Sequence, residues 1–198
     1  MAFLSIEDAL TGELDVEEKV ASIPDSLQVK GMFFSRLRDR VGSGFAELEP
    51  QLVKPPRRGH YVAFIDYPQR DYMRVAAAAA QRMYPTVSLR EALRRLARTD
   101  FEVFSGSRVG KVVLATVGDA HTALLTVPRV YPKMAPGDYR MEGTDLDPET
   151  VRIEMNPTYG AWEYVLGQLE GLVMHFGAAP RTEVSLPGEG VRFDVRHG

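Results

Sequence analysis

The chain has 198 residues, of which 44% are hydrophobic and 26% charged, and it carries 24 Lys and Arg against 27 Asp and Glu, a net charge of −3. These values are typical of one soluble domain, large enough to bury a full core. The absence of cysteine excludes disulfides, thiolate metal sites and thiol nucleophiles. The weakly negative charge argues against a nucleic-acid partner.

The N-terminus does not have the pattern of a signal peptide. Acidic residues begin at Glu7, so the basic start and the long apolar run of such a peptide are missing. The rest of the sequence holds no apolar run that approaches the roughly 20 residues of a transmembrane helix. We therefore expect a cytoplasmic protein with no membrane span.

The first part of the chain predicts an acidic N-terminal arm, residues 1–24, ahead of a single domain over residues 25–198. Within the arm, residues 5–20 indicate a short helix or partial order. An amphipathic helix is predicted from an N-cap at residue 25 or 26 to Gly42, because apolar residues recur at spacings of three and four. In the long connection that follows, we expect a short helix near 45–52.

Two helices are predicted to form a hairpin around Pro85. Residues 69–84 are rich in alanine, the best helix former, whose small side chain allows close packing. Ser88 and Glu91 have the spacing of a capping box and begin a second helix, which is expected to end at about Arg98. Residues 101–134 fit either strand or helix, because their valines favour strand while their spacing slightly favours helix.

Within the segment 101–134, Asp119 is a candidate N-cap for a helix through Leu125, which Pro128 breaks or kinks.

The clearest patterns follow Gly137. Strands are then predicted at 139–142 and 151–155. A helix over 159–176 ends before Gly177, and a hairpin joins strands at 183–186 and 191–195. A helical N-terminal half followed by ββ-α-ββ predicts an α+β domain with a four-stranded, mostly antiparallel sheet, covered on one side by the helix 159–176.

Two glycines in the helix 159–176 need an explanation. Gly167 and Gly171 each cost roughly 1 kcal/mol relative to alanine inside a helix. Close packing of another helix is the preferred interpretation, and room for a ligand or a subunit is the alternative. We take Gly167 and Gly171, with Trp162 and His121, as the candidate ligand-binding residues.

The other polar residues give no strong chemical signal. A lone helical histidine can ligate haem. His175 lies off the apolar stripe and is expected to be exposed. For His121, a hydrogen bond to the backbone is the preferred interpretation, and a haem ligand is the alternative. No histidine pair has a metal-binding spacing. The arginines of the second predicted helix are interpreted as a solvated face, with an anion or partner patch as the alternative: Arg90, Arg94 and Arg98. Glu163, Glu170 and Asp194 are interpreted as exposed carboxylates, so no catalytic site is predicted.

Several motifs resemble a large myxobacterial family of paralogous, uncharacterised proteins of similar length, a domain of unknown function. The resemblance covers about residues 29–196 and implies no catalytic residues. It rests on these segments: Val29-Lys30-Gly31-Met32-Phe33-Phe34, Asp66-Tyr67-Pro68, Met83-Tyr84-Pro85, Glu91-Ala92-Leu93-Arg94-Arg95-Leu96 and Gly167-Gln168-Leu169-Glu170-Gly171-Leu172.

The order of elements is also similar to the ligand-binding fold shared by haem nitric-oxide sensors, vinyl-reductase-like sensor domains and vesicle-tethering subunits. The Y-x-S-x-R motif of the haem sensors is absent, so no cofactor is expected. Together these patterns favour a non-enzymatic sensor or adaptor domain in signalling. It would bind a small apolar ligand, or a protein partner, between the helical half and the sheet. The alternative is a homodimeric scaffold whose alanine-rich helix packs across a two-fold axis.

Overall fold

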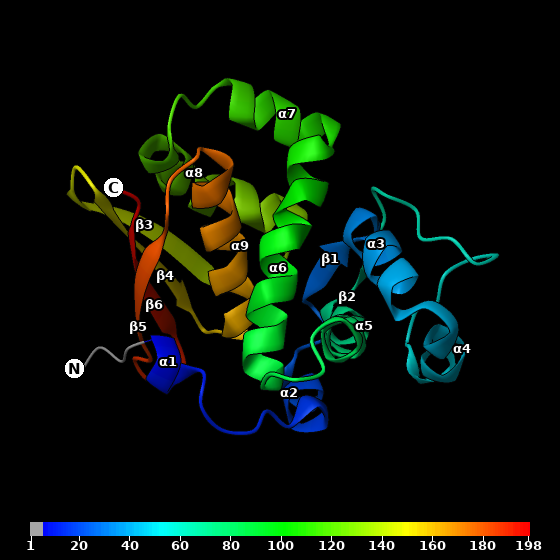
Figure 1. Ribbon diagram of the computed structural model, residues 1–198. Helices are drawn as coiled ribbons and strands as arrows, with labels where there is room; N and C mark the ends of the chain where they lie inside the picture. The colour runs from blue at the N-terminus through cyan, green and yellow to red at the C-terminus, as the bar shows by residue number, and fades with distance from the viewer. Residues whose placement is uncertain (1–5) are drawn as a thin grey trace.

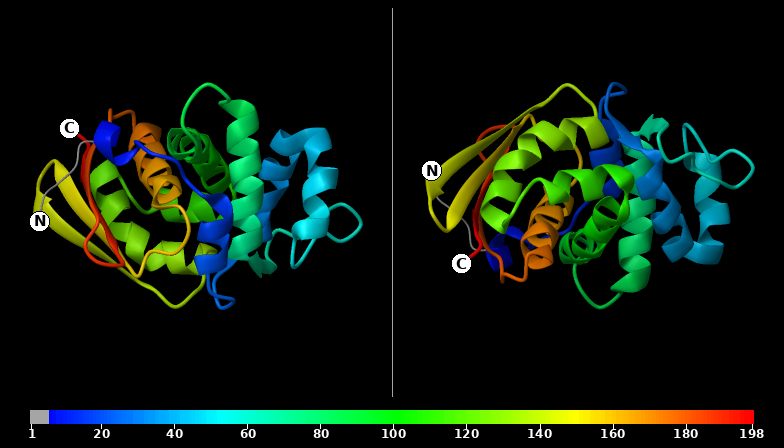
Figure 2. Two further views of the ribbon diagram at one scale, coloured as in Figure 1. Left: turned by 90° about the horizontal axis from the view of Figure 1, so that it is seen from below. Right: turned by 90° about the horizontal axis from the view of Figure 1, so that it is seen from above.

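The computed structural model describes residues 6–198, so the first five residues of the predicted arm lie outside the described part. The molecule is elongated, with a four-stranded sheet at one end and the helices α3 (Gly31–Val41) and α4 (Phe45–Leu48) at the other (Figure 1). Between them, α6 (Leu89–Gly106) and α9 (Trp162–His175) run side by side and make the most extensive helix contact. Two further views show the same three-part arrangement (Figure 2).

The acidic segment at the start of the chain packs onto the domain. It holds α1 (Ile6–Ala9) and α2 (Val16–Ser22), and the Asp15 side chain caps α2 by accepting from the backbone N–H of Glu18 at 3.0 Å. The helix α2 contacts α5 (Gln69–Met83), and α1 contacts the sheet. Leu10, Leu14, Val20 and Ile23 are buried, so residues 6–24 contribute to the core.

The first amphipathic helix begins later than predicted, because residues before it form a strand. β1 (Gln28–Lys30) pairs antiparallel with β2 (Asp66–Pro68), and this pairing commits Val29 to an extended conformation opposite Tyr67. The helix α3 therefore begins at Gly31 and not at residue 25 or 26. In the connection that follows, α4 and the 3₁₀ turn η2 (Glu49–Gln51) confirm the short helix expected near 45–52.

The alanine-rich helix α5 finds its close neighbours within the same chain. Its alanines at 76, 77, 79 and 80 are buried, and the helix packs against both α3 and α6. Of the five alanines 76–80 only Ala78 is partly exposed, so most of the alanine surface that a homodimer would use packs within the chain. Ser88 caps α6 as predicted, accepting from the N–H of Glu91 at 3.2 Å, but α6 continues about two turns beyond Arg98, to Gly106.

The segment that fitted strand or helix is helical. After α6 it forms α7 (Arg108–Ala115) and α8 (Ala120–Met134), and Asp119 caps α8 by accepting from Thr122 N–H at 2.7 Å, as predicted. The helix α8 does not end at Leu125. It runs through Pro128 and Pro132, because its packing against the sheet and α9 outweighs the two lost backbone donors.

The sheet confirms the α+β prediction and is antiparallel throughout, in the order β3-β4-β6-β5. Its strands are β3 (Arg140–Asp147), β4 (Thr150–Asn156), β5 (Arg181–Ser185) and β6 (Val191–Arg196). Alternate residues of β4, such as Ile153, face the helices α8 and α9, while Arg152 faces outward and pairs with Asp194 at 2.7 Å. The helices cover one face of the sheet (Figure 2).

The helix α9 is buried almost all round, which explains its strong apolar pattern. Gly177 follows it with a φ of +80°, the left-handed conformation predicted for the end of this helix. Buried apolar residues form two clusters, one in the helical half and one between α9 and the sheet. No helix within residues 6–198 is long and apolar enough to cross a membrane.

Candidate ligand-binding cavity

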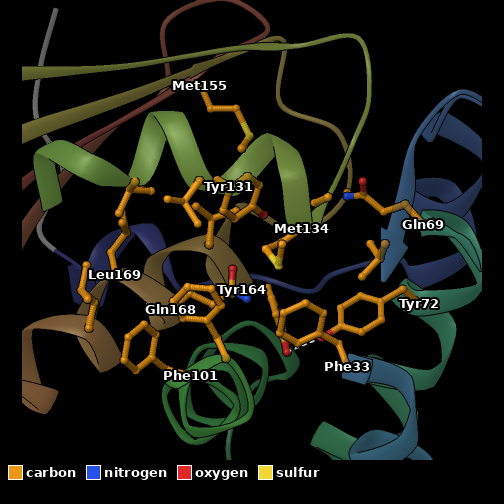
Figure 3. Close-up of a pocket in the computed structure, with 18 of the residues that line it drawn as sticks. Phe33, Gln69, Tyr72, Phe101, Tyr131, Met134, Met155, Tyr164, Gln168 and Leu169 are labelled. Atoms are coloured by element: carbon orange, nitrogen blue, oxygen red, sulfur yellow. Dashed lines mark hydrogen bonds between the residues drawn. The ribbon is translucent and has the colours of Figure 1, made fainter. Parts of the chain in front are cut away.

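We call the segments up to α6 the helical half, and α7, α8, α9 and the four-stranded sheet the sheet half. A cavity of about 140 Å³ lies between these two halves. Its wall comes from segments that are far apart in the sequence: the region before α3, and α5, α6, α7, α8 and α9. Figure 3 shows Tyr131 and Met134 pointing in from α8, Phe101 from α6, and Phe33 and Tyr72 from the helical half. The wall is mostly hydrocarbon, and among the described residues that line it none carries a formal charge.

The helix α9 gives the cavity one stripe of side chains. Tyr164, Gln168 and Leu172 line the cavity at spacings of four residues, and Ala161 and Leu169 flank them. Residues four apart lie above one another on a helix, so this stripe is one face of α9. Gln168 is the residue of this face that brings an amide into the cavity (Figure 3).

The hydroxyl of Tyr164 belongs to a buried polar chain that leads away from the cavity. It lies 2.5 Å from the Tyr72 hydroxyl and donates to Asp100 Oδ2 at 2.6 Å. The other oxygen of Asp100 pairs with Arg40 of α3, whose guanidinium also donates to Thr99 Oγ1 at 2.8 Å. Burial raises the pKa of Asp100, while Tyr164 and Arg40 act in the opposite direction.

Gln168 and Tyr131 bring further polar groups to the wall. The side-chain amide of Gln168 makes no hydrogen bond with any described residue, and its Oε1 is shielded from solvent. The Tyr131 hydroxyl likewise has no hydrogen bond within residues 6–198, and burial raises its pKa, so it stays a neutral phenol. By contrast, the Tyr139 hydroxyl donates to the carbonyl oxygen of Ala135 at 2.5 Å.

The side of α9 that faces α6 is joined to it by buried ion pairs. Glu170 accepts from Arg94 Nη2 at 2.6 Å and from Arg98 Nε at 2.7 Å, and Glu163 pairs with Arg90. Both glutamates have 0% exposed surface. The predictions of a solvated arginine face and of exposed glutamates were therefore wrong, because each charge has its partner on a helix about 70 residues away, which spacing within one helix does not reveal.

Close packing between α6 and α9 explains the two glycines. A Cβ on Gly167 would collide with the Arg94 carbonyl oxygen and lie 2.7 Å from the Ala97 Cβ. A Cβ on Gly171 would lie 2.8 Å from the Arg98 carbonyl oxygen. This is the packing interpretation preferred from the sequence. Neither glycine lines the cavity, which is formed by their neighbours on the other side of α9.

The other two candidate residues also lie away from the cavity. Trp162 packs against Phe193 of the sheet, with ring centroids 6.4 Å apart. His121 Nδ1 lies 3.0 Å from His197 Nε2, so its partner is a side chain and not the backbone. His175 is exposed, as predicted. The structure thus does not bring Trp162, Gly167, Gly171 and His121 together, and Gln168 was missed although it stands four residues from both Tyr164 and Leu172.

The arrangement of elements is that of the haem-based H-NOX proteins. The chain superposes on an H-NOX protein from S. oneidensis in the Fe(II)NO ligation state with a TM-score of 0.68 and 14% identity, covering 86% of this chain and 99% of that one. An unliganded Fe(II) H-NOX protein from K. algicida gives a TM-score of 0.62 and 17% identity, covering 86% and 97%. At these identities the likeness establishes the fold.

The sequence itself places the chain in a family. Residues 24–196 match the family described as protein of unknown function DUF2378, and the chain belongs to that family. No curated protein matches the sequence. The match begins where the predicted acidic arm ends.

The residues of the cavity do not fit a haem. Among the described residues that line it there is neither histidine nor, in a chain without cysteine, a thiolate to bind the iron. Tyrosine can serve as a haem ligand, but burial raises the pKa of Tyr131 and of Tyr164 and so disfavours the phenolate. The lining residues in the described part also offer no cation to pair with the two haem propionates. The chain shares the fold, and the described lining of its cavity lacks the residues that would hold a haem.

Proposed function

We propose that this chain is a sensor or adaptor domain that binds a small, uncharged and mainly apolar ligand in the cavity, without converting it. The observation that carries the proposal is the cavity itself: a hydrocarbon wall with a few hydroxyl and amide groups, located between the two halves of the molecule. Burial of apolar surface is the driving force that such a wall offers a ligand.

The size of the cavity limits the ligand. A single water needs roughly 10–15 Å³ of such space, so a cavity of about 140 Å³ has room for a ligand of about ten non-hydrogen atoms. A fused two-ring hydrocarbon or a short acyl chain has this size. A tetrapyrrole is larger than this, so it would bind only if the helices moved apart.

The position of the cavity supports a sensing role. Tyr72 belongs to the helical half and Tyr164 to α9; both line the cavity, and their hydroxyls are 2.5 Å apart. A ligand that contacts both side chains therefore acts on both halves at once. If the ligand binds better to one relative arrangement of the halves, it shifts the population toward that arrangement. A protein partner that binds this arrangement would then respond to the ligand.

Native mass spectrometry of freshly purified protein, compared with its denatured mass, tests whether a ligand is held. We expect extra mass in the native peak, and we expect added 2-methylnaphthalene to raise the melting temperature, because a ligand stabilises the folded state by RT ln(1 + [L]/Kd). Val130→Trp fills the cavity from α8, whereas Val112→Trp adds the same side chain at an exposed position of α7 outside the cavity.

The proposal requires 2-methylnaphthalene to stabilise the wild type and Val112→Trp but not Val130→Trp. Equal stabilisation of both variants would place the binding elsewhere. No extra mass together with no stabilisation of the wild type would contradict ligand binding in this cavity.

A further inference from the structure

We infer that the natural ligand carries a hydroxyl group on its apolar body, and that the side-chain amide of Gln168 recognises this hydroxyl. The inference rests on the proposed function, since it names the chemistry of the ligand that the cavity binds. The observation that carries it is the unpaired amide of Gln168, which lies among the apolar side chains that α9 presents to the cavity.

The unpaired amide is the first observation. Gln168 Oε1 is shielded from solvent, and no described residue forms a hydrogen bond with either end of the amide. Leaving a shielded polar group without a partner is unfavourable. A leucine at this position would continue the apolar stripe between Tyr164 and Leu172 without this penalty. A ligand group that pairs with the amide removes it.

The opposite wall offers a second polar group. The Tyr131 hydroxyl on α8 also has no partner among the described residues, and both side chains point into the same cavity (Figure 3). Their neighbours in the wall, such as Leu169 and Met134, are apolar. Gln168 and Tyr131 thus place two unpaired polar groups in a mostly hydrocarbon wall, and a few such groups orient a ligand in a binding pocket.

A hydroxyl complements the Gln168 amide better than other head groups. An amide offers a donor and an acceptor, and a hydroxyl both donates and accepts, so it pairs with Gln168 whichever end of the amide faces it. A ligand carbonyl only accepts and would leave Oε1 without a donor. A carboxylate or an ammonium would be buried without an opposite charge, because the described lining residues include none.

The experiment compares two probes of nearly equal shape, 2-methylnaphthalene and 2-naphthol, which differ by a methyl in place of a hydroxyl. Their dissociation constants are measured by fluorescence titration on the wild type, on Gln168→Leu and on Gln69→Leu. Gln69 is the matched control, because it is a second glutamine of the wall whose amide oxygen is not among the shielded, unpaired atoms.

In the wild type and in Gln69→Leu, we expect 2-naphthol to bind at least as tightly as 2-methylnaphthalene. In Gln168→Leu, we expect the ratio of the two dissociation constants to change by about tenfold or more in favour of 2-methylnaphthalene, because the hydroxyl is then buried without its partner. Melting curves of each variant verify that it is folded.

The outcomes separate this inference from the proposed function. If both probes bind and the ratio is the same in the wild type and Gln168→Leu, the hydroxyl inference is overturned, while ligand binding in the cavity is retained. If the ratio changes equally in Gln69→Leu, recognition by Gln168 is overturned. If neither probe binds the wild type, the proposed function fails and this inference fails with it.

Discussion

The hydroxyl of Tyr164 donates a 2.6 Å hydrogen bond to Asp100, a carboxylate with only 1% of its surface exposed. Tyr164 thereby connects the wall of the cavity to a charged group in the interior of the helical half, and Asp100 continues the connection to Arg40 of α3. Through Asp100, Tyr164 of α9 is thus linked to Arg40 of α3.

Removing the Tyr164 hydroxyl tests the energetic weight of this connection. We expect Tyr164→Phe to lower the free energy of unfolding by about 1–3 kcal/mol, because Asp100 Oδ2 loses its donor inside the protein. Urea denaturation followed by circular dichroism measures the loss. Tyr159→Phe is the control, since Tyr159 lines the same cavity but its hydroxyl makes no hydrogen bond with a described residue; an equal loss there would contradict the prediction.

The buried Asp100 also predicts a pH dependence. Burial raises the pKa of Asp100 in the folded protein above 3.8, the value expected for the unfolded chain. Between pH 3.8 and the pKa of the folded state, the folded state therefore binds more protons than the unfolded state. The contribution of Asp100 to stability is therefore greatest below pH 3.8 and is lost as the pH rises through the folded pKa. We expect the stability of the wild type relative to Asp100→Asn to fall over this window. A rise over the same window, measured by urea titrations, would show that the pKa is lowered instead.

The glycines of α9 give a prediction about packing. Gly167→Ala gains helix propensity, roughly 1 kcal/mol, but its Cβ would collide with the backbone of α6. We expect a net destabilisation of about 1–3 kcal/mol, the usual range for overpacking, seen as a lower melting temperature. Gly106→Ala at the end of α6 is the control, because a Cβ there meets no atom within 4 Å. A Gly167→Ala protein as stable as the wild type would mean that α6 and α9 can separate freely.

The ion pairs of α6 and α9 differ in burial and therefore in energetic weight. We expect Glu170→Gln to destabilise the protein by about 3 kcal/mol, because Arg94 and Arg98 then lose a buried partner. Arg95→Ala breaks the more exposed pair with Glu91 and should change stability by less than about 1 kcal/mol. Chemical denaturation of both variants compares them directly, and equal effects would contradict the burial argument.

Much of the fold could be predicted because its signals are local. The cap at Ser88, the long apolar helix before Gly177 and the C-terminal hairpin each depend on residues a few positions apart. Where the prediction was wrong, distant parts of the chain decided. β1 forms because it pairs with a strand nearly 40 residues later, and α8 runs through two prolines because the sheet and α9 hold it in place.

The cavity could not be read from the sequence for the same reason. Its wall combines side chains from Leu27 to Leu172, and periodicity within one helix does not show which buried face meets a partner and which meets empty space. On α9 the glycines attracted attention because they oppose helix propensity, yet they serve packing on α6. The one sequence signal for the cavity was Gln168, a polar residue between apolar ones at helical spacing.

The two long walls of the cavity differ in how firmly they are held. On one side, α9 is pinned to α6 by three arginines and two buried glutamates. On the other, Pro128 and Pro132 of α8 lack the N–H groups that would bond to the preceding turn. Local opening should therefore begin at α8, with faster amide hydrogen exchange there than in α9. A small molecule can then enter the cavity through a transient opening beside α8, while the ion pairs between α6 and α9 stay intact.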